Sequence, residues 1–151
     1  MGTKITWTGM EYDILLDARS GSRSIGAFVG LDAPGAGPPR HIHHDADESF
    51  YILSGEVEFW VAGKTIFAQA GEMLTVPRGT EHCFRIIGDA PARMLTIMTP
   101  GGFESFFVDV ARENLRIPED MQRISEIGTK YDLEFTGPPI GAADHSKGEM
   151  R

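Results

Sequence analysis

Cysteine is almost absent from this sequence, which contains only Cys83. One thiol cannot form a disulfide within the chain, so a reducing, cytoplasmic location fits the composition best. Long apolar runs are absent too, since no segment approaches the ~20 apolar residues that a membrane span needs. The first residues, Met1–Trp7, contain no apolar stretch of the kind found in signal peptides. The sequence therefore predicts a soluble protein of the cytoplasm with no membrane partner.

Basic residues are also scarce. The chain has 14 Lys and Arg against 22 Asp and Glu, for a formal net charge of -8. This balance disfavours nucleic acid and anionic membranes as partners. No helix-turn-helix segment is evident, which further disfavours a transcriptional regulator. At 151 residues the chain has the length of one domain, and it contains no internal repeat.

Short alternating segments indicate strands over about residues 1–99. Early strands are predicted at Ile5–Trp7, Tyr12–Leu16 and Ser24–Leu31, with turn signals every 8–12 residues along the chain. Later segments alternate clearly, and the residues predicted to face inward are Glu48, Phe50, Ile52, Val57, Phe59 and Val61. This pattern predicts a sandwich or a barrel, but it does not separate a jelly roll from other all-β architectures.

The C-terminal third changes period and predicts a helical segment over about 103–135. Apolar residues recur there at helical spacing, first at Phe103, Phe106, Phe107, Val110 and Ala111, then at Met121, Ile124, Ile127 and Tyr131. Pro118 suits the first turn of the second helix. We expect this pair of helices to pack outside the barrel or to shield one end of it. One domain over 1–140 is predicted, followed by a flexible tail at 141–151.

Three histidines and one glutamate form a candidate metal-binding set. His41 and His43 are two apart, so on a strand both imidazoles leave the same face. The polar residues 45–47 predict a turn, after which Glu48 can face back toward them. His82 comes from a later strand, just beyond a Pro-x-Gly turn. The sequence therefore predicts that these four side chains converge on one divalent ion.

These residues also carry a family resemblance. The first stretch fits the cupin motif G-x5-H-x-H-x4-E-x6-G through Gly35, His41, His43, Glu48 and Gly55. The second fits G-x5-P-x-G-x2-H through Gly71, Pro77, Gly79 and His82, although Ile86 stands where that motif usually ends in Asn. The chain thus resembles small single-domain cupins, in particular those likened to quercetin dioxygenases. The resemblance implies an all-β cupin double-stranded β-helix, or jelly-roll barrel, with a metal in its mouth. It also implies a homodimer, and Tyr51 and Trp60 on the outer face can pack either against a second sheet or against another subunit.

The predicted donors suit several metals and leave room for chemistry. Three imidazoles and one carboxylate can bind Fe, Ni, Mn, Cu or Zn, with one or two coordination positions open to water, substrate or dioxygen. Glu48 is the acidic member of the set, so it is our candidate general base as well as a ligand. The candidates for an apolar substrate wall are Phe50, Ile52, Phe59 and Phe84. Ordinary barrel packing explains these four residues equally well.

Three classes of function follow from this reading. The first is a metal-dependent dioxygenase acting on a small aromatic, flavonoid or polyketide-like molecule. The second is a non-oxidative isomerase, lyase or hydrolase in which the metal acts as a Lewis acid. The third is a small-ligand-binding cupin without turnover. The family resemblance favours the first class. Of the remaining residues with reactive side chains, His44 is predicted to have a surface role and Cys83 to be a buried apolar residue facing away from the metal.

Overall fold

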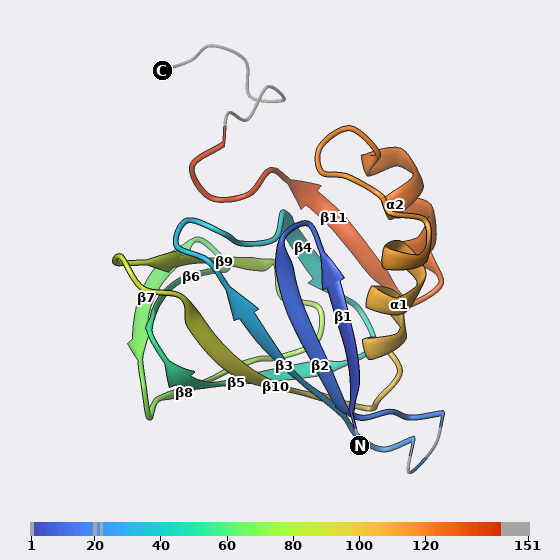
Figure 1. Cartoon of the computed structure of the whole chain (residues 1–151), viewed down its shortest axis with the longest axis horizontal. Coiled ribbons are helices and arrows are strands. Elements are labelled where there is room, and N and C mark those ends of the chain that lie inside the picture. The colour runs from blue at the N-terminus through green and yellow to red at the C-terminus, as the bar shows by residue number, and fades with distance from the viewer. Residues whose placement is uncertain (1, 20, 22, 143–151) are drawn as a thin grey trace.

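The computed structural model describes residues 2–19, 21 and 23–142, and it consists mainly of two antiparallel sheets (Figure 1). The first sheet has the strand order β1 (Thr3–Trp7), β2 (Met10–Leu16), β3 (Gly26–Asp32), β10 (Ala92–Thr99), β5 (Asp47–Ser54) and β8 (Met73–Val76). The second has the order β11 (Leu133–Gly137), β4 (Arg40–His43), β9 (His82–Ile87), β6 (Glu56–Val61) and β7 (Lys64–Gln69). The predicted all-β jelly-roll fold is confirmed.

The alternation predicted for the central strands holds in the structure. Val57 and Phe59 are fully buried, whereas Glu56 is exposed and Glu58 is half-buried and pairs with Arg85. The inward residues of the two sheets meet in an apolar cluster of Phe50, Ile52, Val57, Phe59, Ala68, Val76, Ile86, Ala92 and Met94. This cluster, which we call the deep core, stabilises the two sheets against each other.

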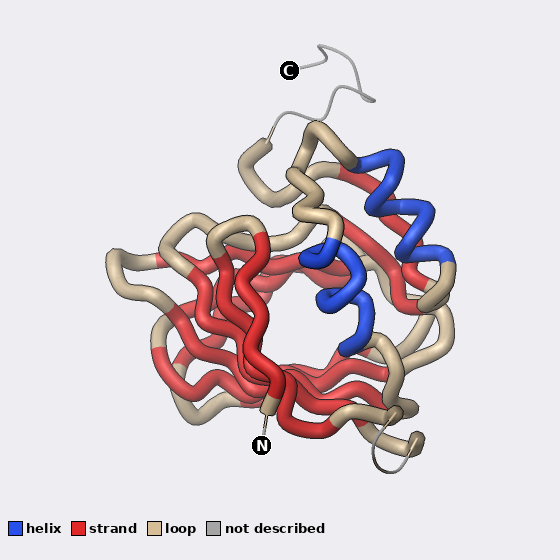
Figure 2. Tube along the Cα trace, turned by 45° about the vertical axis from the view of Figure 1, so that its right-hand side comes forward, coloured by secondary structure: helices blue, strands red, loops and turns tan. Residues whose placement is uncertain are grey.

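A second apolar cluster joins the N-terminal strands to the C-terminal helices α1 (Glu104–Arg112) and α2 (Met121–Thr129). The Tyr12 ring stacks on Phe107 at 4.0 Å between centroids, and the Trp7 indole N–H donates a 2.7 Å hydrogen bond to the Leu115 carbonyl. Figure 2 shows α1 lying across one end of the ring of strands, with α2 farther out beside β11. Of the two arrangements that we expected, α1 therefore shields one end of the barrel. Neither helix in the described ranges is long and apolar enough to cross a membrane.

The predicted helical segment over 103–135 is wrong at its C-terminal end, where the structure has the strand β11. Leu133 is buried and pairs with His43, while Phe135 pairs with His41. The chain leaves the helix through Asp132, whose positive φ of 55° turns the backbone. Pairing with the open edge of β4 satisfies backbone groups that a continued helix would have left exposed. Of the predicted tail, 141–142 are described and 143–151 lie outside the described residues.

The carboxylate of Glu104 ties the start of α1 to the barrel. Its side chain is fully buried and accepts backbone N–H groups from Ala18 at 2.8 Å and Gly102 at 2.9 Å. A methyl group at Gly26 would overlap this carboxylate, so the glycine leaves the space that Glu104 occupies.

We expect Glu104→Ala to lower the free energy of unfolding by about 2–4 kcal/mol, because two partly buried N–H donors lose a fully buried acceptor. Urea denaturation followed by circular dichroism measures this loss. The matched control is Glu119→Ala, at an exposed position, where we expect a change within about 0.5 kcal/mol. Equal unfolding midpoints for the two variants would show that Glu104 does not anchor α1.

Candidate metal centre

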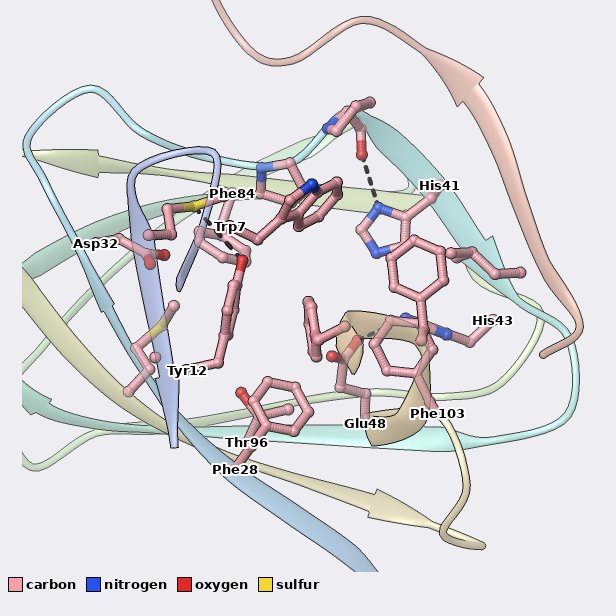
Figure 3. A pocket seen from close by; sticks show the side chains of 18 of the residues that line it. Trp7, Tyr12, Phe28, Asp32, His41, His43, Glu48, Phe84, Thr96 and Phe103 are labelled. Atoms are coloured by element: carbon pink, nitrogen blue, oxygen red, sulfur yellow. Dashed lines mark hydrogen bonds and ion pairs between the residues drawn. The ribbon is translucent and has the colours of Figure 1, made fainter. Parts of the chain in front are cut away.

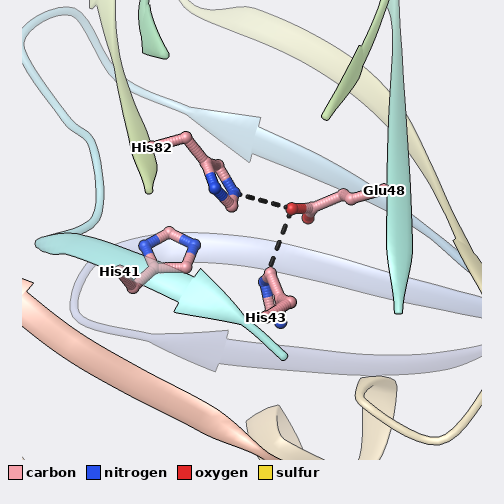
Figure 4. Close-up of side chains that lie close together, drawn as sticks. All are labelled: His41, His43, Glu48 and His82. Carbon is pink, nitrogen blue, oxygen red and sulfur yellow. Dashed lines mark hydrogen bonds and ion pairs between the residues drawn. The ribbon is translucent and has the colours of Figure 1, made fainter. Parts of the chain in front are cut away.

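Two sheets supply the four predicted metal donors. In the second sheet, β4 carries His41 and His43, and His41 pairs in register with His82 of β9. The chain bends at residues 44–46 and then enters β5 of the first sheet, which carries Glu48. Because of this crossing, Glu48 faces the histidines from the opposite sheet, as Figure 4 shows. The structure thus brings together all four residues, which we call the metal centre.

The donor atoms of the metal centre lie within coordination range of a common point. One donor atom from each residue can be chosen so that all of them lie within 4.8 Å of one another, and all four residues are buried. The Nε2 atoms of His82 and His43 lie 2.9 Å and 3.4 Å from Oε1 of Glu48. Three imidazoles and one carboxylate around one point are a donor set that divalent transition metals use.

Hydrogen bonds to backbone carbonyls orient two of the imidazoles. Nδ1 of His41 lies 2.7 Å from the Pro39 carbonyl oxygen, and Nδ1 of His82 lies 2.9 Å from that of Thr80. Each Nδ1–H therefore donates to a carbonyl, which directs Nε2 toward the centre. Within the described ranges, neither ring nitrogen of His43 has a hydrogen-bond partner, although the residue is only 3% exposed. A buried imidazole without partners is costly, and a bound cation would remove that cost.

The electrostatics of the site favour metal-binding protonation states. Burial and the neighbouring imidazoles hold the pKa of His41 well below its usual value, and burial likewise lowers that of His43. Burial raises the pKa of Glu48, but the three histidines outweigh burial and bring it to about 2. Burial lowers the pKa of His82, and its hydrogen bond to Glu48 more than reverses this effect. The residues therefore fit a divalent ion, whose binding would release the proton that His82 shares with Glu48.

A cavity of about 80 Å³ opens beside the metal centre, and its walls are mostly aromatic. Of the four predicted wall residues, Phe50 and Phe84 line this cavity. Ile52 and Phe59 do not line it, and both side chains have no exposed surface. Their strand faces were predicted correctly, but their positions along the barrel axis place them under other side chains.

Much of the cavity wall comes from segments that sequence reasoning did not select. These residues are Trp7, Tyr12, Phe28, Asp32, Thr96, Phe103 and Phe107, contributed by β1, β2, β3, β10, α1 and the residue before α1 (Figure 3). Phe103 also packs edge-on against His43, with 4.5 Å between ring centroids. The sequence did offer a signal that Asp32 could be a functional residue, because an acidic residue ends the apolar strand that precedes the motifs. The sequence offered no such signal for the aromatic residues, since aromatic side chains on strands usually belong to the hydrophobic core.

The other residues with reactive side chains lie away from the metal centre. His44 is on the surface and forms a 2.8 Å contact with Glu134. Cys83 is buried, and burial raises the pKa of its thiol to about 11, which disfavours the reactive thiolate. Trp60 lies under the guanidinium of Arg40, 4.4 Å from the ring centroid. This cation–π contact already covers one face of the indole ring.

Asp32 makes stability depend on pH. Burial raises the pKa of its carboxyl from 3.8 to about 7. The folded state therefore binds this proton more tightly than the unfolded state does. Stability is highest while the carboxyl is protonated, and it falls as the pH rises from about 4, near the unfolded pKa, through 7, the folded pKa. Between pH 5 and 8 we expect the wild type to lose on the order of 2–4 kcal/mol relative to Asp32→Asn, which cannot ionise. Urea denaturation of both proteins at the two pH values measures the difference. Parallel curves would contradict the raised pKa.

Comparison with known proteins places this geometry in a family. Residues 29–98 match the Cupin_2 model, described as a cupin domain. The chain is 33% identical over 85 residues to a quercetin 2,3-dioxygenase of Bacillus subtilis (strain 168), covering 54% of this chain and 25% of the relative. It is 33% identical over 75 residues to polyketide synthase CurC of Streptomyces cyaneus, covering 48% of this chain and 49% of the relative. The chain thus spans a quarter to about half the length of these relatives.

A solved structure agrees with this result. A structure reported for the substrate binding mode and a reaction specificity switch in oxalate decarboxylase superimposes with a TM-score of 0.60 at 27% identity, covering 66% of this chain and 28% of that one. All four residues of the metal centre lie inside the matched cupin segment. With this match, and with the jelly-roll arrangement of its two sheets, the chain contains a cupin domain over residues 29–98.

Proposed function

We propose that this protein is a metal-dependent dioxygenase that acts on a small aromatic molecule of the flavonoid or polyketide type. The observation that carries the proposal is the position of the metal centre, where His41, His43 and Glu48 form part of the wall of an aromatic cavity. A site of this kind offers a cation to one end of a ligand and apolar rings to the rest of it. Similarity to a quercetin 2,3-dioxygenase and to a polyketide synthase protein supports the same substrate class.

The charge of the cavity wall narrows the class of possible substrates further. In the described part of the chain, no lysine or arginine lines this cavity. A carboxylate or phosphate substrate would therefore find no basic partner beside the metal, whereas a phenol or an enol needs none. Aromatic walls favour a flat ring system by stacking and by burial of apolar surface. These features favour a neutral polyphenol over a small acid or a sugar phosphate.

The residues of this chain have separate roles in the proposed reaction. His41, His43, His82 and Glu48 would hold a divalent ion such as Fe, Ni, Mn, Cu or Zn, which supplies Lewis acidity and, where the ion is redox-active, access to dioxygen chemistry. Glu48 would accept the proton of the substrate hydroxyl at a carboxylate oxygen as that hydroxyl approaches. Phe103, packed against His43, would exclude water from the reacting end of the substrate.

Oxygen consumption tests this proposal. Protein reconstituted without oxygen with Fe(II), Ni(II) or Mn(II) is mixed with quercetin and a panel of polyphenols in an oxygen electrode, and products are analysed by mass spectrometry under ¹⁸O₂. We expect substrate loss to match oxygen uptake, with ¹⁸O in the product. Turnover that proceeds equally well without oxygen would contradict the dioxygenase assignment.

The structural likeness to an oxalate decarboxylase favours one alternative, a non-oxidative lyase using the same metal centre. That non-oxidative reaction, unlike a dioxygenation, would proceed in the absence of oxygen. Product analysis of an anaerobic reaction therefore separates the two functions, because a decarboxylation releases CO₂ and a dioxygenation cannot occur.

A further inference from the structure

The carboxyl group of Asp32 is buried in the wall of the cavity without a protein partner for one of its oxygens. Asp32 is 3% exposed, and within the described ranges its Oδ1 has no hydrogen-bond partner. Among the acidic residues that the structure describes outside the metal centre, Glu104 is also buried, but it accepts two backbone N–H groups. Burying a carboxyl group without partners costs free energy, so a residue with this environment calls for an explanation other than stability.

A second polar group lies beside Asp32. The Tyr12 hydroxyl reaches only a weak acceptor, the sulfur of Met10 at 3.6 Å. Between Asp32 and the Tyr12 ring lies Gly30, where an added methyl group would come within 3.7 Å of Asp32 Oδ1 and 3.8 Å of the tyrosine ring. The absence of a side chain at Gly30 leaves this space open to the cavity. We call Asp32 and the Tyr12 hydroxyl the polar pole.

The polar pole and the metal centre lie at opposite ends of the cavity. Figure 3 shows Asp32 and Tyr12 on one side and His41, His43 and Glu48 on the other. Strand register gives the separation, because Asp32 pairs with Ala92 of β10 and Glu48 pairs with Met98 of the same strand. Six residues of strand correspond to roughly 20 Å between these positions.

We propose that Asp32 and Tyr12 bind a hydroxyl group at the end of a phenolic substrate that lies away from the metal centre. This inference rests on the proposed function and specifies its substrate class. A hydroxyl group can donate to Asp32 and accept from Tyr12, so it satisfies both members of the polar pole at once. The aromatic residues between the two ends would stack on the rings of the substrate.

A pair of flavonols that differ in one hydroxyl tests the polar pole. The probes are 3-hydroxyflavone and 3,4′-dihydroxyflavone, which share the metal-binding end and differ only at the pendant ring. Binding to nickel-loaded protein is measured without oxygen by isothermal titration calorimetry. We expect the wild type to bind the dihydroxy probe about tenfold more tightly, as a hydrogen bond to a buried acidic group provides.

Three variants assign this preference to Asp32. We expect Asp32→Leu to lose the tenfold preference while binding 3-hydroxyflavone as tightly as the wild type does. Asp32→Asn keeps the shape and one acceptor, so it should retain part of the preference. The control is Asp89→Asn at an exposed position, which should behave as the wild type.

Stability provides a readout that does not depend on a ligand. If Asp32 serves binding, Asp32→Asn at pH 8 should unfold at a higher urea concentration than the wild type, because a buried and partly unpaired carboxylate is removed. A purely structural role predicts the opposite change.

The outcomes separate this inference from the proposed function. Equal binding of the two probes by the wild type, or a preference that persists in Asp32→Leu and Asp32→Asn, would overturn the role of Asp32 alone. Failure of both probes to bind nickel-loaded wild type would overturn the polyphenol substrate class, and the inference would fall with it.

Discussion

His82→Ala is expected to abolish metal binding at the metal centre. Its Nε2 lies 2.9 Å from Glu48, and its other nitrogen is held by the Thr80 carbonyl, so the substitution removes one of the four donors that face the centre. Loss of a partner that only orients a ligand already weakens metal affinity about 10–100-fold, and loss of a ligand itself should cost at least the upper value. Metal analysis of protein purified without chelator, followed by competition with a chelator of known affinity, measures the loss.

The neighbouring histidine provides the control for this experiment. His44→Ala removes an exposed imidazole that contacts Glu134, and it should leave the metal content unchanged. His43→Ala should behave as His82→Ala does, since both nitrogens of His43 are buried and lack hydrogen-bond partners in the described ranges. Circular dichroism checks that the variants remain folded. A full metal content in both His43→Ala and His82→Ala would disprove the metal centre.

Glu48→Gln is expected to reduce turnover about 10²–10⁴-fold while a substantial share of the metal remains bound. The amide keeps the size of the side chain and one oxygen donor, and three imidazoles remain. It cannot accept the proton of a substrate hydroxyl, so the chemical step suffers more than metal binding does. The measurement is kcat per bound metal, obtained from turnover and metal content of the same preparation.

Glu56→Gln is the matched control, because Glu56 is exposed on β6 and distant from the cavity wall. It should leave both turnover and metal content unchanged. If Glu48→Gln retains wild-type kcat per metal, Glu48 is not the general base and serves only as a ligand. If it loses metal and turnover in equal proportion, the loss arises from coordination and the base role is again unsupported.

The strand faces and the four donors could be predicted from the sequence because both depend on local spacing. Alternation of period two placed Val57 and Phe59 inward and Glu56 outward, since successive side chains on a strand leave opposite faces. The interval between His41 and His43 and the turn before Glu48 predicted convergence, and the structure brings these residues together with His82. Local helical spacing likewise predicted α1 and α2.

Other features could be decided only by contacts between distant segments. Periodicity tells which face of a strand a residue occupies, but not how deep along the barrel it lies. Both Phe50 and Ile52 belong to the deep core and share a face of β5, but only Phe50 of the two also lines the cavity. By spacing alone, Leu133 and Phe135 continue the helical pattern of the preceding segment. In the structure they form a strand because they pair with the open edge of β4. This edge exists only once the second sheet has formed.

The spacing of neighbouring residues was enough to predict the strand faces and the four candidate metal donors, and the resemblance carried by the two motifs predicted the cupin fold. Only the tertiary structure decided how the cavity is closed and what it can select. Trp7 and Phe107 meet across about a hundred residues of chain, and Asp32 becomes part of a buried cavity wall only when β2, β3, β10 and α1 surround the same space. Burial and pairing of this kind depend on the packing of whole elements, so they cannot be read from spacing along one segment.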